Sequence, residues 1–194
     1  GLVNSFLRTF ARNRGAVIGL CILVAVVAIA ILAPLLYPGS PWRMVHRPFL
    51  APFVLDRAPL GSDTVGRDIL AGLVHGSRVS LLIGLVSTLV ALLVGVPLGA
   101  ISGYFGGWVD AALMRVTEFF QTIPSFALAI VIVSILQPSV ASIVLAIAIV
   151  SWPPVARLVR GEVLSVRTRD YVQAAIVTGQ PVHKVILIEV LPNV

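Results

Sequence analysis

Long apolar runs separated by short polar segments dominate this sequence. The first run, residues 16–36, contains 21 residues without a charge. A helix of that length spans about 31 Å, which is enough to cross a hydrocarbon core of roughly 30 Å. The run exceeds the roughly 7–15 apolar residues of a signal peptide, and no small-residue cleavage pattern precedes Pro34. We therefore predict a retained membrane span over residues 16–36, after a basic lead-in over residues 1–15.

Two later apolar runs predict three more spans. Residues 79–101 form an uncharged run of 23 residues, and residues 119–156 form one of 38 residues, which is too long for a single span. The polar tripeptide Gln137-Pro138-Ser139 divides the longer run into a hairpin of two helices. With their flanks, the predicted spans cover residues 79–102, 110–136 and 139–157.

Small residues recur at every fourth position of the second predicted span, at Ser87, Ala91, Gly95 and Gly99. This spacing puts them on one helix face, where small side chains let two membrane helices approach closely. We expect that face to pack against another helix.

Arg115 and Glu118 lie near the start of the third predicted span. Their i, i+3 spacing lets them pair on one helix face. Ionisable groups so close to a bilayer are costly and often functional. A pair that positions the helix at the interface is the preferred interpretation, and a contact with substrate is the alternative.

Residues 37–78 form a proline-rich polar loop between the first two spans. Within it, Asp63 can cap the helix that follows, because a carboxylate accepts from the free amides of a first helical turn. Asp63, Asp68 and His75 match no strong metal-binding spacing, so capping or ion pairing with Arg67 is the preferred interpretation. We therefore assign no metal site.

Composition agrees with a membrane protein. The chain is 58% hydrophobic and 11% charged, with a mean hydropathy of +1.04, whereas a soluble domain has about 25% charged residues. The net charge of +6 does not indicate nucleic-acid binding, because the cations border the apolar runs as membrane-flanking charges do. The single cysteine, Cys21, allows no internal disulfide and no metal cluster.

The last part of the chain is a polar stretch that the spans themselves do not require. Asp170 is a candidate N-cap for a helix of about two turns over residues 171–178. Gly179 follows at the position where a left-handed C-cap favours glycine. Pro181 suits the start of a second helix, which Pro192 would end. This pattern predicts a helix–turn–helix outside the membrane.

Ala174 and Ala175 leave a flat spot on the first of these helices. Another surface could approach closely there, so we predict that the helix–turn–helix docks onto a partner. The alternative is a solvated amphipathic hairpin in which the alanines and the glycine serve only helix formation.

Charge counts orient the predicted spans. Four spans place the lead-in and the final polar stretch on one side of the membrane. The lead-in has three Lys or Arg residues and the segment after the fourth span has five, while the 37–78 loop on the opposite side also has five. The side of the two ends therefore has eight Lys or Arg residues and the side of the loop has five. This difference favours both ends inside, because cytoplasmic segments carry more Lys and Arg.

Catalytic motifs are absent from the sequence. It has no Gly-x-x-x-x-Gly-Lys-Ser/Thr phosphate loop, no Gly-x-Ser-x-Gly elbow and no His-Glu-x-x-His pair. We therefore expect no ATP hydrolysis and no catalytic residue in this chain.

Two stretches resemble a known family. Pro59-Leu-Gly-Ser-Asp-Thr-Val-Gly-Arg-Asp68 is similar to the signature after the first span of dipeptide and oligopeptide permeases, with Ala58 and Ser62 as departures. Gln173-Ala174-Ala175, Gly179 and Glu189-Val-Leu-Pro-Asn193 resemble the EAA loop of ABC-importer permeases, in which Gln173 replaces the usual Glu and Glu189 the His of peptide permeases.

The resemblance implies an all-α polytopic membrane bundle, the type I transmembrane domain of a C-type permease subunit, with residues 79–194 as its core. It implies a cytoplasmic coupling loop over residues 160–193 that fits a groove of the ATPase. In this chain the coupling residues would be Tyr171, Gln173, Ala174, Ala175, Gly179, Leu191 and Pro192. Further membrane helices follow the loop in that family, so we expect this chain to be truncated.

The same resemblance implies the partners. They would be a homologous second permease, two ABC ATPase subunits that hold ATP and Mg²⁺, a periplasmic or extracellular solute-binding protein, and membrane lipid. The chain itself would carry no cofactor and would lie in a bacterial or archaeal inner or plasma membrane, with its N-terminus and EAA loop cytoplasmic. Related permeases carry peptides, nickel or glutathione, so the substrate stays open.

Two other classes remain as alternatives. A fragment of a secondary transporter or channel would handle coupling ions with intramembrane carboxylates, for which only Glu118 qualifies. A structural membrane assembly subunit would explain the small-residue face but not the final polar stretch.

Overall fold

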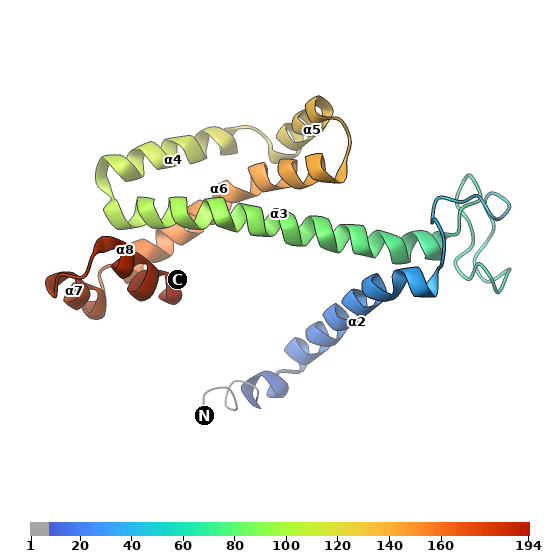
Figure 1. The fold of residues 1–194 in the computed structure, drawn as a ribbon, viewed down its shortest axis with the longest axis horizontal. Coiled ribbons are helices and arrows are strands. Elements are labelled where there is room, and N and C mark those ends of the chain that lie inside the picture. The colour runs from blue at the N-terminus through green and yellow to red at the C-terminus, as the bar shows by residue number, and fades with distance from the viewer. Residues whose placement is uncertain (1–7) are drawn as a thin grey trace. The chain divides into compact units, whose positions relative to one another are not determined.

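The computed structural model describes residues 8–194, so part of the lead-in predicted over residues 1–15 lies outside the described residues. The chain forms two compact units, one up to Leu82 and one from Ile83 onward. The helices, in chain order, are α2 Arg14–Leu36, α3 Ile69–Phe105, α4 Gly107–Thr122, α5 Ser125–Leu136, α6 Val140–Val166, α7 Asp170–Val177 and α8 Val182–Lys184 (Figure 1). The all-α class is confirmed over this part of the chain, which contains isolated β-bridges but no named strand.

In the first unit, α2 coincides with the first apolar run. The side chain of Asn13 caps it by accepting from the Ala16 N–H at 3.2 Å. Most of its apolar side chains are exposed in this chain, and only Ala30 and Ala33 are buried. A helix that is apolar all round suits a lipid environment.

The loop between α2 and α3 is ordered by hydrogen bonds rather than by strands. The Ser62 hydroxyl donates to the Arg47 carbonyl and accepts from the Leu50 N–H at 3.0 Å. Gly61 and Gly66 have φ of 76° and 85°. An added Cβ would lie 2.0 Å from the Leu50 carbonyl oxygen at Gly61 and 2.2 Å from that of His46 at Gly66. Both positions therefore require glycine.

Asp68, not Asp63, caps α3. The Asp68 carboxylate accepts from the Leu70 N–H at 2.8 Å and from the Ala71 N–H at 3.1 Å. The Asp63 carboxylate instead accepts from the N–H groups of Val65 and Arg67 and closes a turn within the loop. These donors, that of Arg67 first, hold the pKa of Asp63 below its ordinary value.

α3 has 37 residues, from Ile69 to Phe105, and is longer than the predicted span 79–102. The prediction started after Arg78 because it followed the uncharged run. A charge does not end a helix, however, and the Asp68 cap lets α3 begin ten residues before that run.

The small-residue face of α3 packs against α6 in the second unit. An added Cβ would lie 2.9 Å from the Trp152 carbonyl oxygen at Gly95, 2.4 Å from that of Ala156 at Gly99 and 2.9 Å from that of Arg160 at Gly103. Ser87 and Ala91 continue the same face and are buried. The Ser87 hydroxyl also donates to the Val144 carbonyl at 3.3 Å. The two backbones therefore approach as closely as missing side chains allow.

The predicted span 110–136 is two helices in the structure. α4 and α5 are bent by 82° at the break that contains Pro124 (Figure 1). Ile123, directly before the proline, is extended, with φ of −83° and ψ of 129°, as the clash with a following proline ring requires. By length and composition three described helices can cross a membrane, or four if this bent pair counts as one span.

α6 extends beyond the predicted span 139–157. Ser139 and Ser142 form a capping box at its start, and the helix continues to Val166. Pro153 and Pro154 lie inside it. Its buried residues belong to two clusters, one shared with α3 and the final helices and one shared with α3 and α4.

We expect Gly99→Ala to destabilise the packing of α3 on α6, because even one methyl group would meet the Ala156 carbonyl oxygen at 2.4 Å. Overpacking of this kind costs about 1–3 kcal/mol. Gly84→Ala on the same helix is the matched control, since nothing lies within 4 Å of its added Cβ. Accumulation in the membrane and the thermal midpoint in detergent would both fall for Gly99→Ala alone. Equal values for the two variants would contradict the close approach.

Candidate functional site

The candidate site begins where α6 ends. Arg169 is the N-cap residue of α7, in extended backbone conformation, and Asp170 is the first helical residue rather than the cap. A carboxylate in the first turn still interacts favourably with the positive end of the helix dipole. α7 ends at Val177, after two turns.

Gly179 turns the chain back toward a second helix. It has φ of 79°, in the left-handed region where glycine has no Cβ penalty. The Gly179 N–H donates to the Ile176 carbonyl, and the Gln180 N–H donates to the Ala175 carbonyl. These are the two bonds of a Schellman C-cap, which satisfies carbonyls at the end of α7.

The second helix has mixed geometry. Pro181 precedes α8, and the chain then continues as a π-helix over Val185–Val190 and a 3₁₀ turn over Leu191–Asn193. Pro192, which the sequence suggested as the end of an α-helix, lies inside this last turn. Short π segments are rare and are often found at functional sites.

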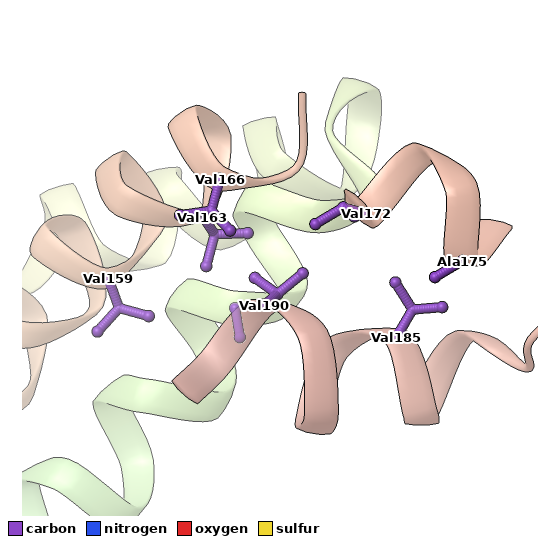
Figure 2. Close-up of a cluster of buried hydrophobic side chains, with 8 residues drawn as sticks. Val159, Val163, Val166, Val172, Ala175, Val185 and Val190 are labelled. Atoms are coloured by element: carbon purple, nitrogen blue, oxygen red, sulfur yellow. The ribbon is translucent and has the colours of Figure 1, made fainter. Parts of the chain in front are cut away.

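A cluster of small apolar side chains lies beneath the two helices. Figure 2 shows Ala175 of α7 and Val185 of the second helix directed toward each other, and Val190 close to Val163 of α6. The buried members come from α3, α6, α7 and the π-helix: Ala100, Val159, Val163, Val166, Val172, Ala175, Val185 and Val190. The spacing of Val185 and Val190 suits the π-helix, since five residues make about one of its turns.

The predicted coupling residues divide into two groups. Tyr171, Gln173, Ala174, Gly179 and Pro192 are exposed, whereas Leu191 is half-buried against the cluster. Ala175 is 7% exposed and faces Val185. The expectation of an open flat spot at Ala175 is therefore wrong, and only Ala174 offers such a surface.

Large apolar side chains also remain exposed on these helices. Val177 at the end of α7 is 85% exposed, and the other exposed members are Tyr171, Ile176, Val182, Leu187 and Ile188. We call these six residues the exposed apolar face. An apolar face on a polar segment is typical of a protein interaction site. The pair of alanines in the sequence does not indicate this face, because the exposed apolar residues lie at other positions.

Arg115 and Glu118 form an ion pair of 3.5 Å between Nη1 and Oε2. Their side chains are 85% and 60% exposed, so the pair contributes little to stability. In the described residues neither side chain reaches the candidate site.

A second group of polar contacts joins α3, α4 and α6 near the candidate site. Arg160 of α6 donates from Nε and Nη2 to the two carboxylate oxygens of Asp110 on α4, at 2.5 Å each. Ser102 of α3 also donates to Asp110. Arg167 Nη1 donates to the carbonyls of Gly103 and Tyr104, at 3.0 Å each.

Arg160 and Arg167 are each 50 or more residues from their partners in the chain. No local spacing in the sequence indicates such distant pairs, and from the sequence Arg160 and Arg167 count only as flanking charges.

Residues 95–194 match the family described as binding-protein-dependent transport system inner membrane component. Residues 2–57 match the N-terminal transmembrane domain of oligopeptide transport permease C. The first match alone covers more than half of the chain. The chain belongs to this inner-membrane transport component family.

Curated relatives of this transport component agree with the family. The dipeptide transport system permease protein DppC of Haemophilus influenzae is 39% identical over an alignment of 189 positions that covers 95% of this chain and 64% of that protein. The di/tripeptide transport system permease protein DppC of Pseudomonas aeruginosa is 39% identical over an alignment of 197 positions that covers 98% of this chain and 65% of that protein. The oligopeptide transport system permease protein OppC of Escherichia coli is 36% identical, over 96% of this chain and 62% of that protein. The chain thus spans somewhat less than two thirds of these relatives.

For this transport component, Ala175→Arg should disturb folding and Ala174→Arg should not. Ala175 is buried against Val185, so a charged side chain there would force the final helices apart. Ala174 is exposed, and an arginine there can reach solvent. Limited proteolysis in detergent should show cleavage near residues 170–194 for Ala175→Arg and the parental pattern for Ala174→Arg. Parental protection of both variants would contradict the cluster.

Proposed function

We propose that this chain is a membrane-spanning permease subunit of an ATP-driven importer for peptides or similar small solutes. It forms part of the translocation path and couples that path to separate ATPase subunits. The observation that carries the proposal is the exposed apolar face on α7 and the helix after it, held by the valine cluster. This face lies within residues 95–194, which match the transport family.

The geometry suits a helix that docks into a groove. α7 has two turns, is fixed on one side by Val172 and Ala175, and presents Ile176 and Val177 on its exposed surface. A short amphipathic helix of this kind binds a groove through a few apolar anchors. Its firm attachment to α6 and α3 lets a displacement of the docked helix move the membrane helices.

The relatives support the identity of the solute and the partners. Their names specify dipeptides, di- or tripeptides and oligopeptides, and the matched family is a component of binding-protein-dependent transport. We infer a complex with a homologous second permease, two ATPase subunits and an extracytoplasmic solute-binding protein. ATP and Mg²⁺ would bind the ATPase subunits.

The mechanism that follows is a rigid-body transition. Closure of the two ATPase subunits on ATP would displace the docked helices, and the membrane halves would rock between inward-facing and outward-facing states. A channel or secondary transporter is the weaker candidate, since Glu118, the carboxylate proposed for ion coupling, is paired with Arg115.

Topology labelling tests the orientation we propose, with both ends in the cytoplasm of an inner or plasma membrane. Cys21 is the only cysteine and is exposed, so Cys21→Ala provides the background. Ser40→Cys and Gln180→Cys both lie at exposed positions. An impermeant thiol reagent added outside should label Ser40→Cys and should reach Gln180→Cys only after the membrane is opened. The reverse pattern would refute the cytoplasmic docking site.

Val177→Asp tests docking without disturbing the cluster, because Val177 is 85% exposed. Loss of a central anchor costs about 2 kcal/mol or more, which lowers affinity roughly thirtyfold. We expect Val177→Asp to accumulate normally but to lose the ATPase subunits in co-purification, together with dipeptide uptake.

Val177→Ile is the matched control, since it keeps an apolar side chain, and Gln180→Ala beside the turn should also have little effect. Retention of the ATPase by Val177→Asp at the parental level would rule out this face as the docking surface.

A further inference from the structure

The turn between α3 and α4 lies against the positively charged guanidinium of Arg167. Gly106 and Gly107 have φ of 66° and 54°, and they reverse the chain directly after Phe105. The last carbonyls of α3 have no partners within the helix and give its end a partial negative charge. Arg167 Nη1 occupies this position, at 3.0 Å from the carbonyls of both Gly103 and Tyr104.

The first turn of α4 is fixed to α6 at the same end. The Arg160 guanidinium donates twice to the Asp110 carboxylate, and the Ser102 hydroxyl donates to the same carboxylate. A bidentate pair fixes direction as well as distance. The two side chains are 32% and 18% exposed, so the pair is only partly screened by solvent.

Arg167 also connects this corner to α7. It is the C-cap residue of α6, and its own carbonyl accepts from Gln173 Nε2 at 2.9 Å. Of α3, α4 and α6, only α6 is joined directly to α7 through the backbone, by residues 167–169. Its links to the α3–α4 corner are therefore the Arg167 side chain and the apolar cluster.

We propose that Ser102, Asp110, Arg160 and Arg167 form a corner clamp that delivers movement of the docked helices to α3 and α4 as well as to α6. The clamp residues are positioning residues, and the inference rests on the proposed function. The valine cluster holds the elements together but has little directional preference, because apolar contacts can slide. The five hydrogen bonds of these side chains supply the missing direction. Without them α7 can move with α6 while the α3–α4 corner stays behind.

The test uses the assembled transporter, with its second permease and ATPase subunits, in proteoliposomes supplied with its binding protein. The quantity measured is the amount of radiolabelled dipeptide imported per ATP hydrolysed. Asp110→Asn removes the charge pair at one end of the clamp. Arg167→Met removes the donor at the other end and keeps the length of the side chain.

We expect both variants to bind the ATPase and hydrolyse ATP at the parental rate. The dipeptide imported per ATP should fall by roughly fivefold or more. A factor of about five is the lower end of the range that typical coupling free energies between two sites produce. Arg167→Lys can still donate to the carbonyls of Gly103 and Tyr104 and should restore most of the ratio. Glu162→Gln, an exposed carboxylate on the same helix as Arg160, is the matched control and should leave the ratio unchanged.

The outcomes separate this inference from the proposed function. A parental complex that binds no ATPase overturns the proposed function and the clamp with it. A working parent whose Arg167→Met variant imports as much dipeptide per ATP overturns the clamp alone. Arg167→Met decides the question even if Asp110→Asn fails to accumulate, because Arg167 lies at the helix end and only its donor is lost. Equal losses in Arg167→Met and Arg167→Lys would also overturn it, since they would indicate general damage.

Discussion

The close contact of α3 with α6 is the constraint on which the rest of the second unit depends. Gly95, Gly99 and Gly103 bring the backbone of α3 against the carbonyls of α6. In lipid, apolar surface gives no driving force between helices, so packing and hydrogen bonds must hold them. The same contact brings Ser102 and the end of α3 beside Arg160 and Arg167. It also aligns Ala100 with the valines of α6, which form the floor for the final helices.

The arrangement of the candidate site depends on these valines of α6. The valines of α6 support Val172 and Ala175 on one side and Val185 and Val190 on the other. Because small side chains fill the cluster, the helices lie close to it and their remaining apolar residues face outward. The exposed apolar face is thus a consequence of tight internal packing. Its shape is set by the buried residues of the cluster.

Local chemistry could be predicted from the sequence, and pairings between distant segments could not. The small residues at every fourth position of α3 and the left-handed turn at Gly179 depend on residue types a few positions apart. Both could therefore be predicted from the sequence. The direction of Ala175 depends on Val185, ten residues away on another helix, and the sequence gives no sign of that contact. The Asp110–Arg160 pair is separated by 50 residues. Residues 110–136 were predicted as one span, and the bend of 82° between α4 and α5 is a feature of the fold that the apolar run did not indicate.

The π-helix at Val185–Val190 has a consequence for sequence register. Its wider turn accommodates one more residue than an α-helical turn, so the segment behaves as an α-helix with one inserted residue. Each residue of an α-helix rotates the chain by about 100°. At constant length, rewinding this segment into a regular α-helix would place Val190 about 140° around the helix from Val185 and turn it away from the valines of α6. Deleting one residue between the two valines would instead leave them four positions apart, on one face of a regular helix. A deletion of one residue should therefore be tolerated better here than an insertion, because the insertion adds to the excess that the wider turn already absorbs.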